Sequence, residues 1–235
     1  MLDDEGKYLG FDAVLGNPPY IRQEELGAYK AHLQTHFETY AGTADLYVYF
    51  VERGMNVLRP GGHFSYILPN KWMRAGYGDK LRQYIKRHRI EGISDFGDLP
   101  VFEEATTYPC ILELRRTDAQ ASFPAVAIDT LSYDISLSDY IRSHSFSVGL
   151  SGLSDSGWTL SNQSVQQLLD KLCAAGTPLG EYVQGKIYYG IKTGLNEAFV
   201  IDAITRDRLI AEDARSAEVI KPFWREGILK GIRRR

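Results

Sequence analysis

Hydrophobic and polar residues follow one another along the first half of the chain in blocks that predict strands and helices in turn. Short apolar runs at 11–16 and 63–68 end at prolines, and each predicts a buried strand. Between them, residues 45–58 carry apolar side chains close to helical spacing, and the Pro-Gly-Gly sequence at 60–62 is expected to stop that helix. This half of the chain therefore predicts alternating strands and helices.

The next three blocks complete the predicted sheet. Residues 72–87 predict a basic amphipathic helix, and residues 90–96 and 107–114 predict two strands with no helix between them. A parallel neighbour would need a helical crossover, so the last strand is expected to be antiparallel. The predicted fold class is α/β, formed by the carboxyl-terminal half of a mixed sheet.

The pattern weakens after residue 116. Residues 123–129 indicate a further strand, and the region that follows is rich in Ser and Asp and has no clear period. Asn162 is a suitable cap for a helix over 161–175. The residues of that helix expected to face inward are Val165, Leu168, Leu169 and Leu172.

A break follows this helix. The sequence Gly-Thr-Pro at 176–178 interrupts the chain, and residues 186–201 indicate a Gly- and Tyr-rich β segment. We therefore expect two domains, residues 1–175 and residues 176–235.

The composition is that of an ordinary globular protein. The chain has 235 residues, of which 44% are hydrophobic and 24% charged, and no apolar run approaches the length of a membrane span. Two cysteines, Cys110 and Cys173, are too few for a disulfide framework or a four-cysteine zinc site. The first residues are acidic where a signal peptide would be basic. We expect a cytoplasmic protein with no membrane partner.

Charge is unevenly distributed although the net charge is only −3. Seven basic residues stand between positions 71 and 89 against the single acid Asp79, and six aspartates stand between 117 and 170 against Arg142 alone. A basic run of this kind is often a solvated helix face. It permits a polyanionic partner without demonstrating one.

The sequence Asn17-Pro18-Pro19-Tyr20 follows the first predicted strand, where ligands bind in open α/β sheets. One interpretation is a stiff turn alone, because Asn and Pro both favour turns. The alternative is a site for a planar amine. The Asn17 side-chain oxygen and the Pro18 carbonyl can accept hydrogen bonds from an amine that becomes more nucleophilic as a result, and Tyr20 offers a face on which a base can stack.

These residues resemble the amino DNA methyltransferases, whose Asn-Pro-Pro-Tyr turn binds the target adenine. The likeness continues through Asp45-Leu-Tyr47, Leu58-Arg-Pro-Gly-Gly62, Leu68-Pro-Asn-Lys-Trp72, Asp95-Phe-Gly-Asp-Leu-Pro-Val-Phe102 and Thr106-Thr-Tyr-Pro-Cys-Ile-Leu112. That order is similar to the adenine-specific N6 methyltransferases of type II restriction-modification systems, especially those fused to an endonuclease. The resemblance implies a Rossmann-like methyltransferase sheet, double-stranded DNA as partner, catalytic roles for Asn17 to Tyr20, and Phe102 as a second aromatic contact to a flipped adenine.

A second likeness begins at residue 177. The segments Pro178-Leu-Gly-Glu-Tyr-Val183, Gly190-Ile-Lys-Thr-Gly-Leu-Asn-Glu-Ala-Phe199 and Ile220-Lys-Pro-Phe223 resemble the opening of the target-recognition domain of the fused enzymes. A plain β-hairpin with Gly turns is the alternative.

The resemblance also implies S-adenosylmethionine as cofactor, with Asn17 bordering the methyl group. In this family the glycine-rich cofactor loop precedes the Asn-Pro-Pro-Tyr strand, and no such loop is found in this sequence. We therefore expect a middle fragment that lacks the amino-terminal half of the methyltransferase, is inactive alone, and has an exposed sheet edge through which it could self-associate.

Two other functions stay open at this point. The same turn could modify a glutamine amide of a protein, or the chain could be a non-catalytic remnant that binds DNA. His32 and His36 lack a third metal ligand, Cys110 is expected in the core, and Lys71 and Lys192 are the lysines considered for phosphate contact. Three tryptophans are expected to be packing residues, namely Trp72, Trp158 and Trp224.

Overall fold

The computed structural model describes residues 4–6, 8–102, 107–186 and 200–221. The chain divides into two compact units, residues 1–176 and residues 177–235. The first unit contains a six-stranded sheet, and the described part of the second contains the helices α6 (Leu179–Tyr182), α8 (Ala203–Glu212) and α9 (Ser216–Val219). The β segment expected at 186–201 lies almost entirely outside the described residues.

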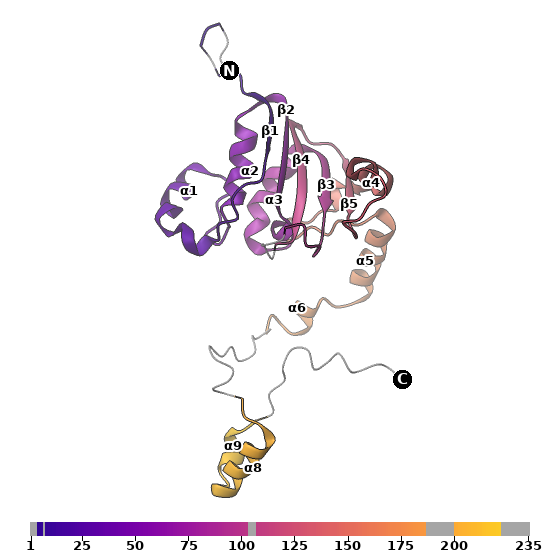
Figure 1. The fold of residues 1–235 in the computed structure, drawn as a ribbon. Helices are drawn as coiled ribbons and strands as arrows, with labels where there is room; N and C mark the ends of the chain where they lie inside the picture. Colours follow the sequence, from indigo (N-terminus) through magenta and orange to yellow (C-terminus); the bar gives the residue numbers. More distant parts are fainter. Residues whose placement is uncertain (1–3, 7, 103–106, 187–199, 222–235) are drawn as a thin grey trace. The chain divides into compact units, whose positions relative to one another are not determined.

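The sheet of the first unit has the strand order β1-β2-β4-β3-β5-β6 (Figure 1). The strands are β1 (Phe11–Gly16), β2 (Leu58–Pro69), β3 (His88–Asp95), β4 (Pro109–Asp118), β5 (Ser122–Ala127) and β6 (Phe146–Gly149). β1 and β2 are parallel, as are β3 and β5, whereas β4 is antiparallel to both of its neighbours and β6 to β5. The predicted α/β fold with an antiparallel strand after residue 107 is confirmed.

Helices and short 3-10 turns cover the sheet and connect its strands. They are η1 (Gln23–Tyr29), α1 (Lys30–His36), α2 (Tyr47–Asn56), η2 (Asn70–Met73), η3 (Gly76–Gly78), α3 (Asp79–Lys86), α4 (Leu137–His144), η4 (Leu150–Gly152) and α5 (Gln163–Ala175). α2 lies directly on β2, because a Cβ atom added at Gly54 would be 2.7 Å from a ring carbon of Phe64. The inner faces of α2 and α3 are fully buried, as Val48, Leu81 and Ile85 show.

The basic helix expected at 72–87 is wrong in its extent. Residues 70–78 form the two short turns η2 and η3, and only residues 79–86 are α-helical. The chain bends here because Gly78 approaches the backbone of Trp72, where an added Cβ would lie 2.0 Å from the carbonyl oxygen. The solvated basic face is also wrong in part, since Arg82 is buried and Lys86 is half-buried.

Residues 60–62 do not act as the helix stop that the sequence suggested. α2 ends at Asn56, and β2 already begins at Leu58 and runs through the Pro-Gly-Gly sequence. The pairing of β1 with β2 is irregular between Phe11 and Ala13, whose partners are Leu58 and His63. This irregularity accommodates a proline inside the strand, because a bulged residue needs no ladder hydrogen bond.

Two segments expected to be buried are exposed. β1 pairs only with β2 among the described strands, and Leu15 on it is 74% exposed. α5 follows β6 at the margin of the first unit (Figure 1), and its apolar residues Leu168 and Leu172 are 55% and 59% exposed. The apolar spacing predicts a strand and a helix correctly in both segments, but no other element among the described residues covers their apolar side chains. No helix in the described part of the chain is long and apolar enough to cross a membrane.

Candidate functional site

The register of the sheet brings three strand ends to one edge. Gly16 at the end of β1 is opposite Tyr66 on β2, while Leu68 near the end of β2 and Asp95 at the end of β3 both pair with Cys110 on β4. The segments that leave β1, β2 and β3 therefore start side by side. This edge is where ligands bind in open α/β sheets.

The Asn-Pro-Pro-Tyr turn leaves this edge directly after β1. Its side chains alternate in exposure, since Asn17 and Pro19 are exposed, Pro18 is buried and Tyr20 is half-buried. Gly16 leads into the turn, and a Cβ at this position would lie 3.0 Å from the Tyr66 ring. Only a very small residue therefore fits before the turn without displacing that ring.

The Asp45-Leu46-Tyr47 motif holds the other end of the turn. The Leu46 backbone N–H donates to the Ile21 carbonyl at 3.0 Å, and the Gln23 N–H donates to the Asp45 carboxylate at 3.1 Å. Two motifs separated by more than twenty residues are thus joined, which fixes the path of the chain after Tyr20.

Tyr20 is held in one orientation as a neutral phenol. Its hydroxyl donates to the Ile67 carbonyl on β2 at 3.2 Å. Burial, together with the nearby Cys110, raises the pKa of Tyr20 to about 12. The ring is consequently uncharged at neutral pH and is fixed at its outer end by a backbone acceptor.

Phe102 meets Tyr20 across the site. The two ring centroids are 6.2 Å apart and the ring planes are inclined by 69°. The segment before Phe102 is supported by a small apolar cluster of its own, in which Leu99 and Val101 pack against Phe96, Val126, Ile128 and Tyr140. Each of the five predicted site residues, Asn17 to Tyr20 and Phe102, therefore lies at this edge of the sheet.

A polar link that the sequence reasoning missed joins β2 to the segment carrying Phe102. The Asn70 side-chain amide donates to the Asp95 carboxylate at 2.7 Å, and the Gly97 N–H donates to the same carboxylate at 3.0 Å. The Asn70 N–H also donates to the Tyr108 carbonyl at 2.7 Å. Asn70 and Asp95 stand as polar residues at the ends of predicted strands, but nothing in the sequence indicates that they bond to each other.

The remaining candidates have structural roles. The rings of His32 and His36 stack at 4.0 Å, and no group of three metal-ligating side chains occurs in the part of the chain that the structure describes. Cys110 is buried, which raises the pKa of its thiol and keeps it protonated. Trp72 and Trp158 pack against each other at 5.2 Å in the core. Lys192 and Trp224 lie outside the described residues.

Comparison with known proteins finds similarity to methyltransferases of restriction-modification systems. Residues 2–102 match the family model described as Eco57I restriction-modification methylase. The chain is 28% identical to the type II methyltransferase M.PaeR7I of Pseudomonas aeruginosa over 92% of its length, and 38% identical to the type II methyltransferase M.XhoI of Xanthomonas vasicola over 45%. These matches confirm the resemblance to methyltransferases of type II restriction-modification systems.

The chain is shorter than these relatives. It spans 42% of the length of M.PaeR7I and 19% of the type II restriction enzyme and methyltransferase RM.Eco57I of Escherichia coli, to which it is 26% identical over 81% of its own length. Among solved structures, a modification subunit assigned to a type I restriction enzyme of Vibrio vulnificus YJ016 covers 69% of this chain and 40% of its own, with a TM-score of 0.50 and 14% identity. That likeness shows the fold, which is Rossmann-like.

Proposed function

We propose that this chain carries the target-base site of a DNA adenine-N6 methyltransferase in a restriction-modification system, and that S-adenosylmethionine is the methyl donor. The observation that carries the proposal is the pairing of Tyr20 with Phe102 beside the exposed Asn17. The target is an adenine turned out of double-stranded DNA, since an amine inside the duplex cannot reach this edge of the sheet.

Asn17 and Pro18 activate the amine. The lone pair of an exocyclic adenine amine is delocalised into the ring, which makes the amine a poor nucleophile. Two acceptors that hold its N–H groups favour a tetrahedral nitrogen and stabilise the positive charge that develops as the new N–C bond forms. The Asn17 side-chain oxygen and the Pro18 carbonyl supply these acceptors, and the two prolines keep them in place.

Tyr20 and Phe102 hold the extrahelical base. Because their planes are inclined by 69°, a base that stacks flat on the Tyr20 ring meets Phe102 at a steep angle, one contact being face to face and the other edge to face. Each aromatic contact contributes about 1–3 kcal/mol to holding the base. The Tyr20 hydroxyl bond to Ile67 keeps the ring ready before the base arrives.

The residues of the proposed site act on the target base, and only Asn17 is proposed to lie near the cofactor. S-adenosylmethionine provides the methyl group when bound, and Asn17 is the residue proposed to border it. A cavity of about 630 Å³ is lined by Ser122 and residues between 147 and 166, and it shares no residue with the site. The residues that line this cavity are therefore not proposed to hold the cofactor.

Single-turnover methylation tests the proposal in the methyltransferase that contains this chain. Asn17→Ala should lower the rate of methyl transfer by roughly 10²–10³ with little change in DNA affinity, because the lost acceptor acts on charge formed in the transition state. Tyr20→Ala and Phe102→Ala should instead reduce base flipping, read from a fluorescent adenine analogue. Tyr29→Ala, at a 63% exposed tyrosine, is the matched control and should change neither quantity.

Three outcomes separate the alternatives. Full single-turnover methylation by Asn17→Ala would make the turn structural and end the catalytic interpretation. Methyl transfer to a glutamine peptide but not to duplex DNA would identify a protein methyltransferase. Failure of the methyltransferase that contains this chain to bind S-adenosylmethionine in calorimetry, with DNA binding retained, would identify a non-catalytic binder. We further propose that residues 177–235 begin the target-recognition domain, which deletion of that unit would test through loss of sequence preference.

A further inference from the structure

We infer that Lys71 in η2 and Arg74, the residue directly after η2, contact the DNA phosphate backbone, and this inference rests on the proposed function. η2 begins at Asn70, the residue that links the end of β2 to Asp95. The two basic side chains therefore leave the chain next to the edge of the sheet that holds Tyr20 and Phe102. Lys71 and Arg74 are both exposed.

The residues between and beside these cations are anchored in the core. Trp72 and Met73 are buried, with 0% and 3% of their surface exposed. The backbone N–H of Trp158 donates to the Met73 carbonyl at 2.7 Å, and the centroid of the Trp158 ring lies 5.2 Å from that of the Trp72 ring. Trp72 and Met73 are therefore fixed in the core, while Lys71 and Arg74 on either side of them are exposed to solvent.

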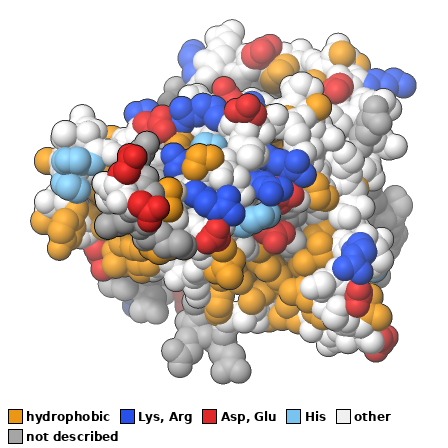
Figure 2. Space-filling model, turned by 90° about the horizontal axis from the view of Figure 1, so that it is seen from above, with side chains coloured by type: hydrophobic (Ala, Val, Ile, Leu, Met, Phe, Trp, Pro, Cys, Tyr) orange, Lys and Arg blue, Asp and Glu red, His pale blue; other side chains and the backbone are white. Residues whose placement is uncertain are grey.

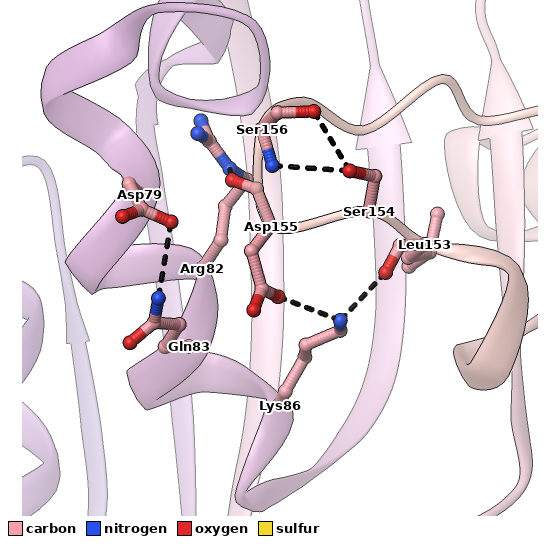
Figure 3. A network of polar contacts seen from close by, with 8 residues as sticks. All are labelled: Asp79, Arg82, Gln83, Lys86, Leu153, Ser154, Asp155 and Ser156. Carbon is pink, nitrogen blue, oxygen red and sulfur yellow. Dashed lines mark hydrogen bonds and ion pairs between the residues drawn. The ribbon is translucent and has the colours of Figure 1, made fainter.

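The buried side chain of Arg82 also holds η2 in place. Arg82 donates through Nη1 to the carbonyl of Trp72 and to that of Ala75 at 2.9 Å, and through Nε to the carbonyl of Asp155 at 2.7 Å. Figure 3 shows Arg82 and Lys86 of α3 reaching the segment from Leu153 to Ser156. The basic run of the sequence thus has two parts, one that ties α3 to this segment and one that faces solvent.

The charges of Lys71 and Arg74 are not neutralised within the described chain. Neither forms an ion pair with a described residue, and the Lys71 ammonium lies 5.7 Å from the centre of the Tyr77 ring, a contact that orients the cation without removing its charge. The amino end of the sheet differs, because basic and acidic side chains interleave there (Figure 2). Its ion pairs are Arg59–Asp12, Arg87–Glu38, Arg89–Glu91 and Arg115–Glu91.

A rigid turn that presents two free cations beside a base site suits a DNA backbone. Phosphate contacts fix the register of a protein on the duplex and carry no sequence information. Such contacts on the strand next to the flipped nucleotide would hold the duplex while Tyr20 and Phe102 hold the base. A fixed turn also loses less conformational entropy on binding than a flexible one.

The salt dependence of DNA binding tests this inference. Fluorescence anisotropy would follow the whole chain on a labelled duplex between 50 and 200 mM salt, for wild type, the double variant Lys71→Gln/Arg74→Gln, and Arg53→Gln. Arg53 is an exposed arginine without an ion pair in the described chain, and it lies in the last turn of α2 near the amino end of the sheet. Thermal melting would verify that the variants remain folded.

The double variant should bind roughly 10- to 100-fold more weakly at 0.1 M salt, and the slope of log K against log salt should fall by about 2. The loss should be the same on target and non-target duplexes, while Arg53→Gln should match the wild type. An unchanged slope, or an equal change in Arg53→Gln, would overturn the phosphate contact and leave the proposed methyltransferase function intact. Failure of the wild type to bind any duplex at low salt would overturn the phosphate contact, whereas the proposed function is tested separately by methylation in the methyltransferase that contains this chain.

Discussion

Arg82→Met tests whether a single buried side chain holds the turn that carries Lys71 and Arg74 to the rest of the first unit. The guanidinium of Arg82 is fully buried and serves three backbone carbonyls, those of Trp72, Ala75 and Asp155. Methionine fills a similar space but donates no hydrogen bond, so three carbonyls lose their partner. Each bond to a charged donor is worth about 1.5–3 kcal/mol, and part of this is offset because the charge no longer has to be desolvated.

The net loss should be about 3–5 kcal/mol in the free energy of unfolding. Urea titration followed by tryptophan fluorescence is a suitable assay, because the rings of Trp72 and Trp158 are buried next to Arg82. Arg87→Met is the matched control, since that exposed arginine forms an ion pair with Glu38 and a contact with the Tyr84 ring but donates to no buried carbonyl in the described chain, and it should lose about 0–1 kcal/mol. If Arg82→Met lost under about 1 kcal/mol, or no more than its control, the network in Figure 3 would not stabilise the turn.

Three further substitutions test the packing and the electrostatics of the first unit. Gly78→Ala should lose about 1–3 kcal/mol in thermal melting because its Cβ would lie 2.0 Å from a carbonyl oxygen, whereas Gly76→Ala meets open space and should be close to neutral. Leu172→Ala should lose under about 0.5 kcal/mol because the side chain is 59% exposed, and the fully buried Leu81 should lose about 2–5 kcal/mol by the same change. Tyr20→Phe should remove a phenol that ionises near pH 12 in a spectrophotometric titration. Since its folded pKa is raised, the stability that this phenol contributes is present below its unfolded pKa and is lost as the pH rises through about 12, so the variant should lose less stability in that range.

The sequence predicted those parts of the fold that depend on local pattern and connectivity. The strands at 11–16, 63–68, 90–96 and 107–114 and the antiparallel direction of the last one follow from apolar periods and from the absence of a helix after residue 96. Burial was less predictable, because it depends on which surface covers an element. Leu168 has the spacing of an inward residue and is exposed.

The site illustrates the same limit. The Asn-Pro-Pro-Tyr turn was recognisable from four adjacent residues, and Phe102 came from a family resemblance. The distance of 6.2 Å between Tyr20 and Phe102 depends on the sheet register and on the Asn70–Asp95 bond, which joins residues 25 positions apart. The charge pattern indicates a basic surface that includes Arg82, because a pattern of charges does not show which cation donates to carbonyls inside the protein.

The strand order has a consequence for how the site comes into being during synthesis. β2 and β3 are consecutive along the chain but do not pair, because β4 lies between them. A nascent chain that stops before residue 109 carries Tyr20 and Phe102 yet lacks the strand that sets the spacing of the edges from which they project. Non-local strand pairing of this kind forms late in folding. Insertion of β4 therefore joins β2 to β3 and brings together the strand ends that carry Tyr20 and Phe102, so that a chain made only as far as Phe102 lacks the aromatic pair.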